Sequence, residues 1–275
     1  MVGYRSSIRA MPARNTTSDS AQAPPFSRRT LVLIPALNEE ASIGPVIRHW
    51  LALGFARVRV VENGSADRTG EVARTAGAEV VFEPRRGYGQ ACWTGLREWP
   101  EDLDWILFSS ADGSDWLEAD ELRQWQQAIT DGARIILGDR TALETSRQEL
   151  KPVQRFGNSL SSGLIRLGWG VRHRDMSSLR LVRRSAFDAM DLADRGFGWN
   201  VEMHVRAAEL DLRVAEVPVL YRPRTGGVSK ISGTLKGSFQ AGTIILGTLG
   251  KLWWSRAHRL GLSRNPNQPK PINGR

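Results

Sequence analysis

The chain has 275 residues, 41% of them hydrophobic, which is enough for one large α/β domain or two small ones and excludes an intrinsically disordered protein. A single cysteine, Cys92, excludes an intramolecular disulfide framework and a cysteine-rich zinc site, so we expect a reduced, cytoplasmic setting. The net charge of +9 lies entirely in residues 1–29 and 256–275, so the neutral segment 30–255 lacks the basic bias of a nucleic-acid-binding domain, and we expect no nucleic-acid partner.

The two ends are predicted to be basic and disordered, over residues 1–28 and 256–275. Such tails suit either attraction to anionic lipid head groups or solubility alone. Because the sequence has neither an apolar run of 18 residues nor the apolar core of a signal peptide near its start, we expect no spanning helix and no secretion signal.

Between the tails, the first half of the chain alternates apolar, β-branched runs with amphipathic stretches. Strands are predicted at 31–34, 58–61, 79–82, 105–108 and 134–137, and helices at 40–53, 66–76 and 117–130. This spacing is that of successive βαβ units, which predicts an α/β fold with a mostly parallel sheet and helices on both faces.

The alternation loosens after residue 150, where we expect short strands at 178–182 and 213–221 and a helix over 200–210. One domain over residues 29–235 is the simplest organisation, followed by an amphipathic helix at 236–255. That helix ends in Trp253 and Trp254, close to Arg256 and Arg259, so it either lies in a membrane interface or packs on the domain.

Three of the predicted strands end in acids or amides. Strand 31–34 leads into Asn38 and Glu39, strand 58–61 into Glu62, and strand 105–108 into Asp112. Each of these strand-to-helix connections, which we call elbows, is alone explained by a turn and a helix cap. Three acids together at the edge of the sheet where the strands end, which we call the rim, would repel one another unless a ligand lies among them. Carboxylates of this kind suit Mg²⁺ or Mn²⁺ shared with the phosphates of a substrate, so we expect one of these cofactors.

Other chemistries find little support. The sequence lacks a GxGxxG turn after the first strand, a GxxxxGK[ST] loop, an HExxH motif and a Gly-x-Ser-x-Gly elbow. A nucleotidyltransferase would need a Gly-rich, Lys/Arg-bearing loop after the first strand, and that loop is absent too. Dehydrogenases, P-loop enzymes, zinc enzymes and serine hydrolases are therefore disfavoured.

The elbows carry a family resemblance. The order Pro-Ala-Leu-Asn-Glu-Glu (35–40), Glu-Asn-Gly-Ser-Ala-Asp-Arg-Thr (62–69) and Ser-Ala-Asp-Gly-Ser (110–114) resembles the family 2 glycosyltransferases over residues 30–235. The second half resembles the dolichyl-phosphate and polyprenyl-phosphate sugar transferase branch, through the blocks at 155–158, 175–180, 198–203 and 226–230. The resemblance implies a GT-A fold, a three-layer α/β/α arrangement around a mostly parallel, Rossmann-like sheet.

The resemblance also assigns residues. It implies nucleotide-sugar binding by Pro35, Ala36, Leu37, Asn38, Glu39, Glu62, Asn63, Gly64, Arg86, Gln90, Ala111, Asp112 and Gly113. Asp112 would hold the metal. The residues expected to bind the diphosphate or the acceptor are Arg155, Arg180, Trp199, Arg222, Ser229 and Lys230. Trp199 either stacks on a sugar or packs in the core.

The implied activity is inverting transfer of a hexose from a UDP- or GDP-linked sugar to a lipid-phosphate or glycan acceptor. A lipid phosphate is already ionised, whereas a sugar hydroxyl needs a general base, for which Asp115, Asp175 and Glu202 are candidates beside the catalytic Asp112. Such an enzyme would work in the cytoplasm, either free or peripherally on the inner face of the membrane.

Two departures from the family pattern affect the metal site. The first carboxylate of Asp-x-Asp is replaced by Ser110, and Ser114 stands where the family has glutamine. Asp115, or arginine and lysine side chains, would then supply the missing charge balance. The alternative is a non-catalytic protein that binds a nucleotide sugar or anionic lipid.

Overall fold

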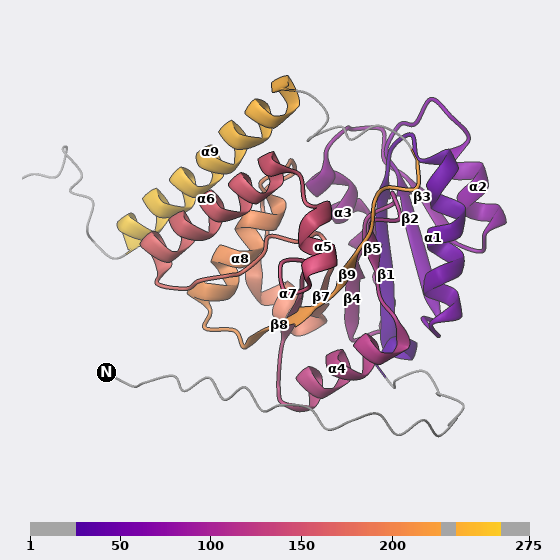
Figure 1. Cartoon of the computed structure of the whole chain (residues 1–275), viewed down its shortest axis with the longest axis horizontal. Coiled ribbons are helices and arrows are strands. Elements are labelled where there is room, and N and C mark those ends of the chain that lie inside the picture. The colour runs from indigo at the N-terminus through magenta and orange to yellow at the C-terminus, as the bar shows by residue number, and fades with distance from the viewer. Residues whose placement is uncertain (1–25, 227–234, 260–275) are drawn as a thin grey trace, which may run out of the picture.

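The structure is a computed structural model that describes residues 26–226 and 235–259. The expected binding residues Ser229 and Lys230, most of the N-terminal segment 1–28 and the tail from residue 260 lie outside the described residues. The fold is the expected three-layer α/β/α arrangement (Figure 1).

A seven-stranded sheet forms the middle layer, in the order β3-β2-β1-β4-β7-β6-β8. Its strands are β1 (Thr30–Ala36), β2 (Arg57–Glu62), β3 (Glu79–Phe82), β4 (Trp105–Phe108), β6 (Ile135–Asp139), β7 (Arg180–Arg183) and β8 (Val214–Pro218). Only β7 runs antiparallel to its neighbours in this sheet, so the prediction of a mostly parallel sheet is confirmed.

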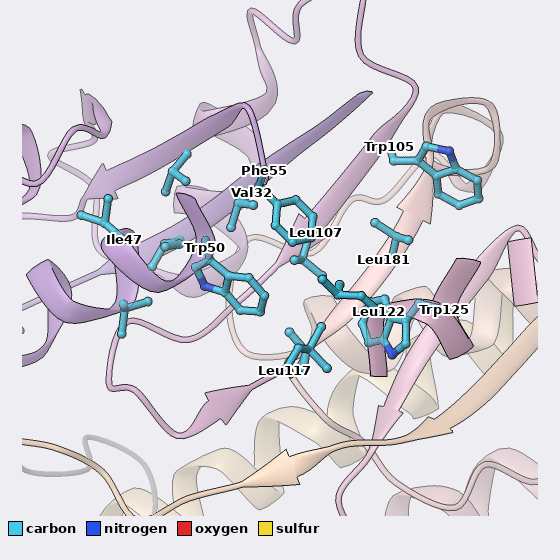
Figure 2. Close-up of a cluster of buried hydrophobic side chains, with 14 of the residues drawn as sticks. Val32, Ile47, Trp50, Phe55, Trp105, Leu107, Leu117, Leu122, Trp125 and Leu181 are labelled. Carbon is cyan, nitrogen blue, oxygen red and sulfur yellow. The ribbon is translucent and has the colours of Figure 1, made fainter. Parts of the chain in front are cut away.

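The strands bury both faces because their residues alternate between two cores. Val32 and Ile34 of β1 enter one core, shown in Figure 2, together with α1 (Glu40–Ala52), α2 (Thr69–Thr75) and α4 (Ala119–Thr130). Leu33 enters the other core, with α3 (Tyr88–Leu96), α7 (Arg184–Met190) and α8 (Trp199–Glu209). The sheet is therefore rigidly covered on both sides, which fixes the positions of its strand ends.

A further pair of helices lies outside α8. These are α6 (Pro152–Trp169), which follows the short α5 (Glu144–Glu149), and α9 (Leu235–Arg259), and both contact α8 and each other (Figure 1). Ile165 of α6, Val201 and Val205 of α8, and Leu249 and Leu252 of α9 share one small core. The C-terminal helix thus packs on the domain along one side. Within the described ranges, no helix combines the length and apolar character needed to cross a bilayer.

The expected strand at 213–221 is two strands in different sheets. β8 joins the large sheet, whereas β9 (Leu220–Tyr221) turns away and pairs antiparallel with β5 (Asp115–Trp116). This two-stranded ribbon lies just beyond the end of β4, so it joins the chain after Asp112 to the chain before residue 226.

Candidate active site

The expected strand ends meet at one edge of the sheet. β2, β1 and β4 are parallel neighbours, and Ala36 at the end of β1 is in register with Glu62. Glu39, Glu62 and Asp112 each follow or end one of these strands. In open α/β sheets, ligands bind beyond these carboxyl ends, so the topology places the elbows where a donor would bind.

Hydrogen bonds tie the elbows to one another. The Asn38 side chain accepts a bond from the Ala66 backbone N–H at 2.7 Å, and the Glu39 backbone N–H donates to Thr69 Oγ1 at 2.8 Å. Asn38 has a left-handed φ of 51°, which asparagine tolerates better than most residues. The first two elbows therefore form one rigid unit.

Asn63 extends this unit to the next strand. Its amide donates to the carbonyls of Glu83 and Arg85 at 2.8 Å, and its oxygen accepts from the Gly87 N–H at 3.0 Å. These bonds connect the second elbow to the chain after β3, and contact of Asn63 with a nucleotide stays a prediction.

The β5–β9 ribbon brings a cation to the two best-placed acids. Arg224 Nη1 lies 2.8 Å from Asp112 Oδ2, and Arg224 Nη2 lies 2.8 Å from Glu39 Oε1. All three side chains are mostly buried, so the guanidinium neutralises two carboxylates that would otherwise repel each other.

Backbone bonds hold Arg224 in this place. The Arg222 N–H donates to the Ser114 carbonyl and the Thr225 N–H donates to the Asp112 carbonyl, on either side of Arg224. Gly113 between them has a φ of +74°, and a Cβ there would lie 2.8 Å from Thr225 Oγ1. A glycine is therefore needed both for its conformation and for the close approach.

Sequence reasoning missed Arg224 and selected its neighbour Arg222. Arg222 pairs with Glu118 on the surface and lies 4.4 Å from the ring centroid of Trp116. The signal that could have identified Arg224 is its position two residues before the Gly226-Gly227 pair of the matched block, in the segment that must return to the rim.

Glu62 does not join the other two acids. Its carboxylate accepts a hydrogen bond from the Ser65 backbone N–H in the same turn. The Glu62 side chain also lies against α2, since a Cβ added at Gly70 would be 3.3 Å from Glu62 Cγ. Arg224 thus joins Glu39 and Asp112, whereas Glu62 forms its hydrogen bond within its own turn at the same rim.

A cavity of about 410 Å³ opens beside this pair, at the start of α1. Its lining includes Asn38, Glu39, Ser42, Asp67 and Val72. Among the predicted nucleotide-binding residues, Asn38 and Glu39 therefore face a cavity. Pro35 and Ala36 end β1, Leu37 follows them, and Ala111 lies in the turn after β4.

Two other predicted nucleotide-binding residues have internal partners. Gln90 donates to the buried carboxylate of Glu83 at 2.7 Å, and Arg86 donates to the Gly64 carbonyl at 3.4 Å. Burial opposes ionisation of Glu83, but the hydrogen bonds from Thr94, Gln90 and Arg85 outweigh it and hold its pKa at about 2. Contact of Gln90 and Arg86 with a nucleotide stays a prediction.

Asp115 lies behind Asp112 rather than beside it. Its carboxylate accepts bonds from the Ser110 backbone N–H at 2.9 Å and from Ser178 Oγ at 3.1 Å, and it is buried. Burial raises the pKa of Asp115, and the charge of Asp112 raises it further. Asp115 therefore holds the loop that carries Asp112, and Ser110, which replaces the family's first acid, lies 2.9 Å from Ser178 through its hydroxyl.

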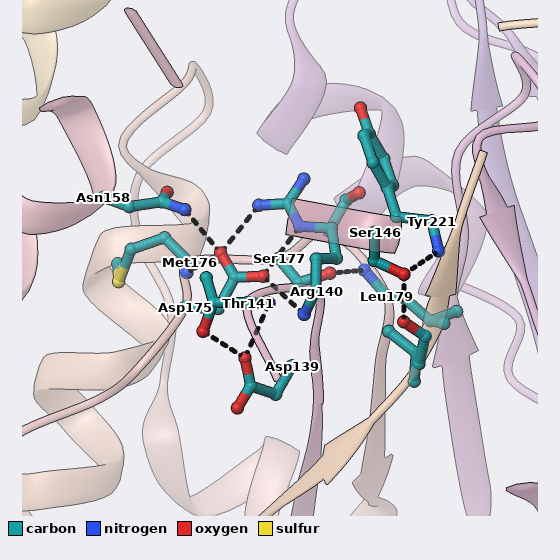
Figure 3. Close-up of polar contacts among 12 residues, drawn as sticks. Asp139, Arg140, Thr141, Ser146, Asn158, Asp175, Met176, Ser177, Leu179 and Tyr221 are labelled. Atoms are coloured by element: carbon teal, nitrogen blue, oxygen red, sulfur yellow. Dashed lines mark hydrogen bonds and ion pairs between the residues drawn. The ribbon is translucent and has the colours of Figure 1, made fainter. Parts of the chain in front are cut away.

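Asp175 forms a buried ion pair with Arg140 (Figure 3). Arg140 Nε and Nη2 donate to its two oxygens at 2.7 and 2.8 Å, and Asn158 donates to it at 2.6 Å. Burial would raise the pKa of this carboxyl, but the Arg140 guanidinium holds it below its usual range. Both oxygens are occupied, so its predicted role as a base has no free acceptor in this conformation.

The second-half block 198–203 is internal. Trp199 is 0% exposed and packs against Phe108 and Phe187, so of the two alternatives the structure shows core packing rather than stacking on a sugar. Glu202 is buried and accepts bonds from the backbone N–H groups of Ala193 and Asp194 at 3.0 and 2.8 Å.

Arg180 is also 0% exposed and donates to the Ser177 carbonyl. The structure therefore contradicts its predicted contact with a diphosphate, because no ligand reaches its guanidinium without rearrangement of the core.

A second cavity, of about 860 Å³, is lined by many cationic side chains. Arg155 lies on its wall, as do Arg147, Arg166, Arg172 and Arg174. Arg155 donates to the carbonyls of Leu150 and Arg147 at 2.9 and 2.7 Å, which fixes its guanidinium at the junction of α5 and α6. An anionic group is the ligand that such a cavity would accept.

The described carboxylates at the rim are too few for a metal site built from protein ligands alone, so the expected metal is one that binds together with its substrate. Among residues 26–226 and 235–259, no group of three or more His, Cys, Asp or Glu side chains is placed to hold a metal ion. Asp112 supplies one carboxylate at the rim, and Mg²⁺ or Mn²⁺ is commonly bound by one or two carboxylates together with substrate phosphates. In this structure Asp112 Oδ1 accepts hydrogen bonds from Ser114 and Oδ2 pairs with Arg224, so an ion bound by Asp112 would displace or share these partners, and the metal site stays a prediction.

Comparison with known proteins agrees with this geometry. The model of glycosyl transferase family 2 matches residues 31–190, more than half of the chain. The chain belongs to this family. The family 2 match covers the strands from β1 to β7 and includes Glu39, Glu62 and Asp112. Relatives of the chain are named glycosyltransferases, so this chain is a glycosyltransferase.

Two relatives and one solved structure illustrate the similarity. An uncharacterized glycosyltransferase of Mycobacterium tuberculosis is 36% identical over 210 residues, 76% of this chain and 93% of that protein. The undecaprenyl-phosphate mannosyltransferase of Micrococcus luteus is 30% identical over 85% of this chain and 100% of its own length. Glucosyl-3-phosphoglycerate synthase of M. tuberculosis, crystallised with Mn²⁺, UDP-glucose and phosphoglyceric acid, has a similar fold, with a TM-score of 0.63, 21% identity and coverage of 88% of this chain and 86% of that one.

Proposed function

We propose that this glycosyltransferase moves a hexose from a UDP- or GDP-linked donor to a polyprenyl phosphate, with inversion at the anomeric carbon, at the inner face of the membrane. The observation that carries the proposal is Arg224 held between Glu39 and Asp112, each at 2.8 Å. It supports the proposal because Arg224 and Asp112, the proposed cation and metal ligand, are joined to Glu39, which lines the cavity proposed to hold the nucleotide.

In the donor half of the reaction, the departing group is a nucleoside diphosphate. Asn38 and Glu39 would hold the nucleoside in the 410 Å³ cavity, and Asp112 would face the diphosphate. A bound Mg²⁺ or Mn²⁺ would neutralise charge on the diphosphate. Arg224 supplies a fixed positive charge at the same rim. Of the two further predicted contacts, Lys230 would add a second charge and Ser229 a hydroxyl donor.

In the acceptor half, the nucleophile is a phosphate oxygen. It attacks the anomeric carbon, the bond from that carbon to the diphosphate oxygen breaks, and the electron pair leaves with the diphosphate. Because a phosphate monoester is ionised at neutral pH, no general base is needed. A reaction without a general base agrees with the internal hydrogen bonds of Asp175 and Glu202, two of the candidate bases. The arginine-lined cavity beside α6 would receive the acceptor phosphate.

The proposal is tested by turnover over a panel of UDP- and GDP-hexoses with undecaprenyl phosphate and, separately, soluble glycans. We expect product with a lipid phosphate and its loss in Asp112→Asn, while Asp120→Asn on the surface of α4 behaves as the wild type. Transfer only to glycans would contradict the acceptor. Calorimetric binding of a nucleotide sugar without any transfer would favour the non-catalytic alternative.

A further inference from the structure

Helices α6 and α9 carry no acidic residue. Residues 152–169 and 235–259 contain neither Asp nor Glu, although they include Arg155, Arg166, Lys251 and Arg256. The two helices contact each other and form the outermost layer of the domain (Figure 1). Although residues 30–255 have no net charge, the charged side chains that these two helices contribute are therefore all cationic.

The outward side of α6 is apolar. Val153, Phe156, Leu160 and Leu167 recur at helical spacing, opposite the buried Ile165 and Ser161. Phe156 is 68% exposed and Leu167 is 74% exposed. Because a folded domain gains stability by burying such side chains, a stripe of them in water indicates a contact surface.

The outward side of α9 continues this character. Thr248, Leu249 and Leu252 face the domain, whereas Trp253 and Trp254 are 56% and 66% exposed and Lys251 lies in the same turn. Arg256 donates to the Gly168 carbonyl at the end of α6, which joins the two helices at this end. Tryptophan beside lysine or arginine is the side-chain pattern of the membrane interface.

We propose that the outer sides of α6 and α9 dock the protein on a bilayer that contains anionic lipids. A lipid surface matches both features at once, since the apolar stripe enters the head-group region and the acid-free flanks face negative phosphates. Neither helix is apolar enough to span, which agrees with a position parallel to the surface.

The docking face also indicates how a lipid phosphate would reach the arginine-lined cavity, an inference that rests on the proposed function. α6 contributes Arg155 and Arg166 to the cavity wall while it exposes Phe156 and Leu167 outside. A polyprenyl phosphate could then leave its chain in the bilayer and place its phosphate against the guanidinium groups. Helix α6 would then contact the bilayer on one side and line the phosphate-binding cavity on the other.

The test measures cosedimentation of the full chain with vesicles of phosphatidylcholine alone or mixed with phosphatidylglycerol, without donor or acceptor. We expect binding to the mixed vesicles, and at least a tenfold loss of partitioning in Phe156→Ser/Leu167→Ser and in Trp253→Ser/Trp254→Ser. Phe82→Ser is the matched control, because Phe82 is 60% exposed on β3 at the far edge of the sheet. Unchanged partitioning of both double variants would overturn the proposal, and binding would then be assigned to the basic tails.

Two measurements keep the test independent of folding defects and of the reaction. Brominated lipids should quench tryptophan fluorescence of the wild-type protein, and Lys251→Glu should weaken binding several-fold at low salt. A dimer in light scattering that the double variants convert to monomer would contradict lipid docking and assign the face to a second copy. Loss of transfer with normal vesicle binding would instead count against the proposed function alone.

Discussion

Arg224 and Asp112 form an ion pair of 2.8 Å although they come from distant parts of the sequence, and the same guanidinium holds Glu39 at 2.8 Å. Three charges of alternating sign therefore share the rim where the resemblance places the donor diphosphate. A metal ion or a diphosphate that reaches Asp112 must rearrange this pair or share it, so the proposed function gives Arg224 a part in donor recognition.

Replacement of Arg224 should affect turnover far more than stability. We expect Arg224→Ala to lower kcat by about 10²- to 10³-fold, since it removes a preorganised cation from the rim, and Arg224→Lys to recover part of this loss. Steady-state kinetics with the best donor is the measurement. Arg123→Ala, in an exposed pair on α4, is the control, and equal effects of the two variants would contradict the assignment.

Gly113→Ala should disturb the same rim through the backbone. The left-handed φ of +74° costs an alanine about 1–2 kcal/mol, and its Cβ would also meet Thr225 Oγ1 at 2.8 Å. Gly64→Ala has a similar φ of +80° but no neighbour within 4 Å, so it should carry only the conformational cost. Chemical denaturation and kcat compare the two, and Thr225→Ala should partly rescue Gly113→Ala. No difference between the two glycines would refute the packing argument.

The Asp175–Arg140 pair should contribute to stability. Asp175→Asn leaves the buried Arg140 guanidinium without a counter-charge, so the free energy of unfolding should fall by about 3–5 kcal/mol. Urea denaturation measures this, with the surface change Asp120→Asn as the control. A fully stable but inactive Asp175→Asn would instead restore the prediction that Asp175 is the general base.

Acid should destabilise the protein through its buried histidines. Burial lowers the pKa of His49 and of His173 to about 4, and that of His204 well below 6.5. The unfolded chain then binds more protons than the native state between about pH 6.5 and 4, so the free energy of unfolding should decrease as pH falls through this window. Each histidine contributes up to about 1.4 kcal/mol per pH unit. Urea titrations at several pH values should show a shallower slope for His49→Gln, and an unchanged slope would rule out this origin.

The first half of the fold was predictable because its strands are continuous apolar runs. The strands expected at 79–82 and 105–108 have these bounds in the structure, and the others differ by one or two residues at an end. Parallel strands buried on both faces leave little freedom, so composition alone identifies them.

The second half was less predictable because long-range packing decides it. Helix α6 contains Gly157, Gly163 and Gly168, which disfavour a helix in isolation, yet it forms by packing on α8 and α9. β7 inserts between β4 and β6, a pairing that no local pattern encodes.

The site was predicted in outline and corrected in detail. Glu39 and Asp112 were identified because they end strands, whereas Arg224 lies in an irregular segment whose return to the rim depends on the β5–β9 pairing. Charged residues in the second-half blocks, such as Arg180 and Glu202, suggested chemistry from sequence but have buried internal partners. A family motif does not by itself separate residues that contact a ligand from residues that support the fold.

The β5–β9 ribbon also orders events during synthesis. Both carboxylates of the rim leave the ribosome well before the guanidinium that joins them, since Glu39 precedes Arg224 by 185 positions. A nascent chain that stops at Pro218 would hold two acids facing one another with nothing between them. The counter-charge of the rim is thus supplied only after residue 224 has been synthesised.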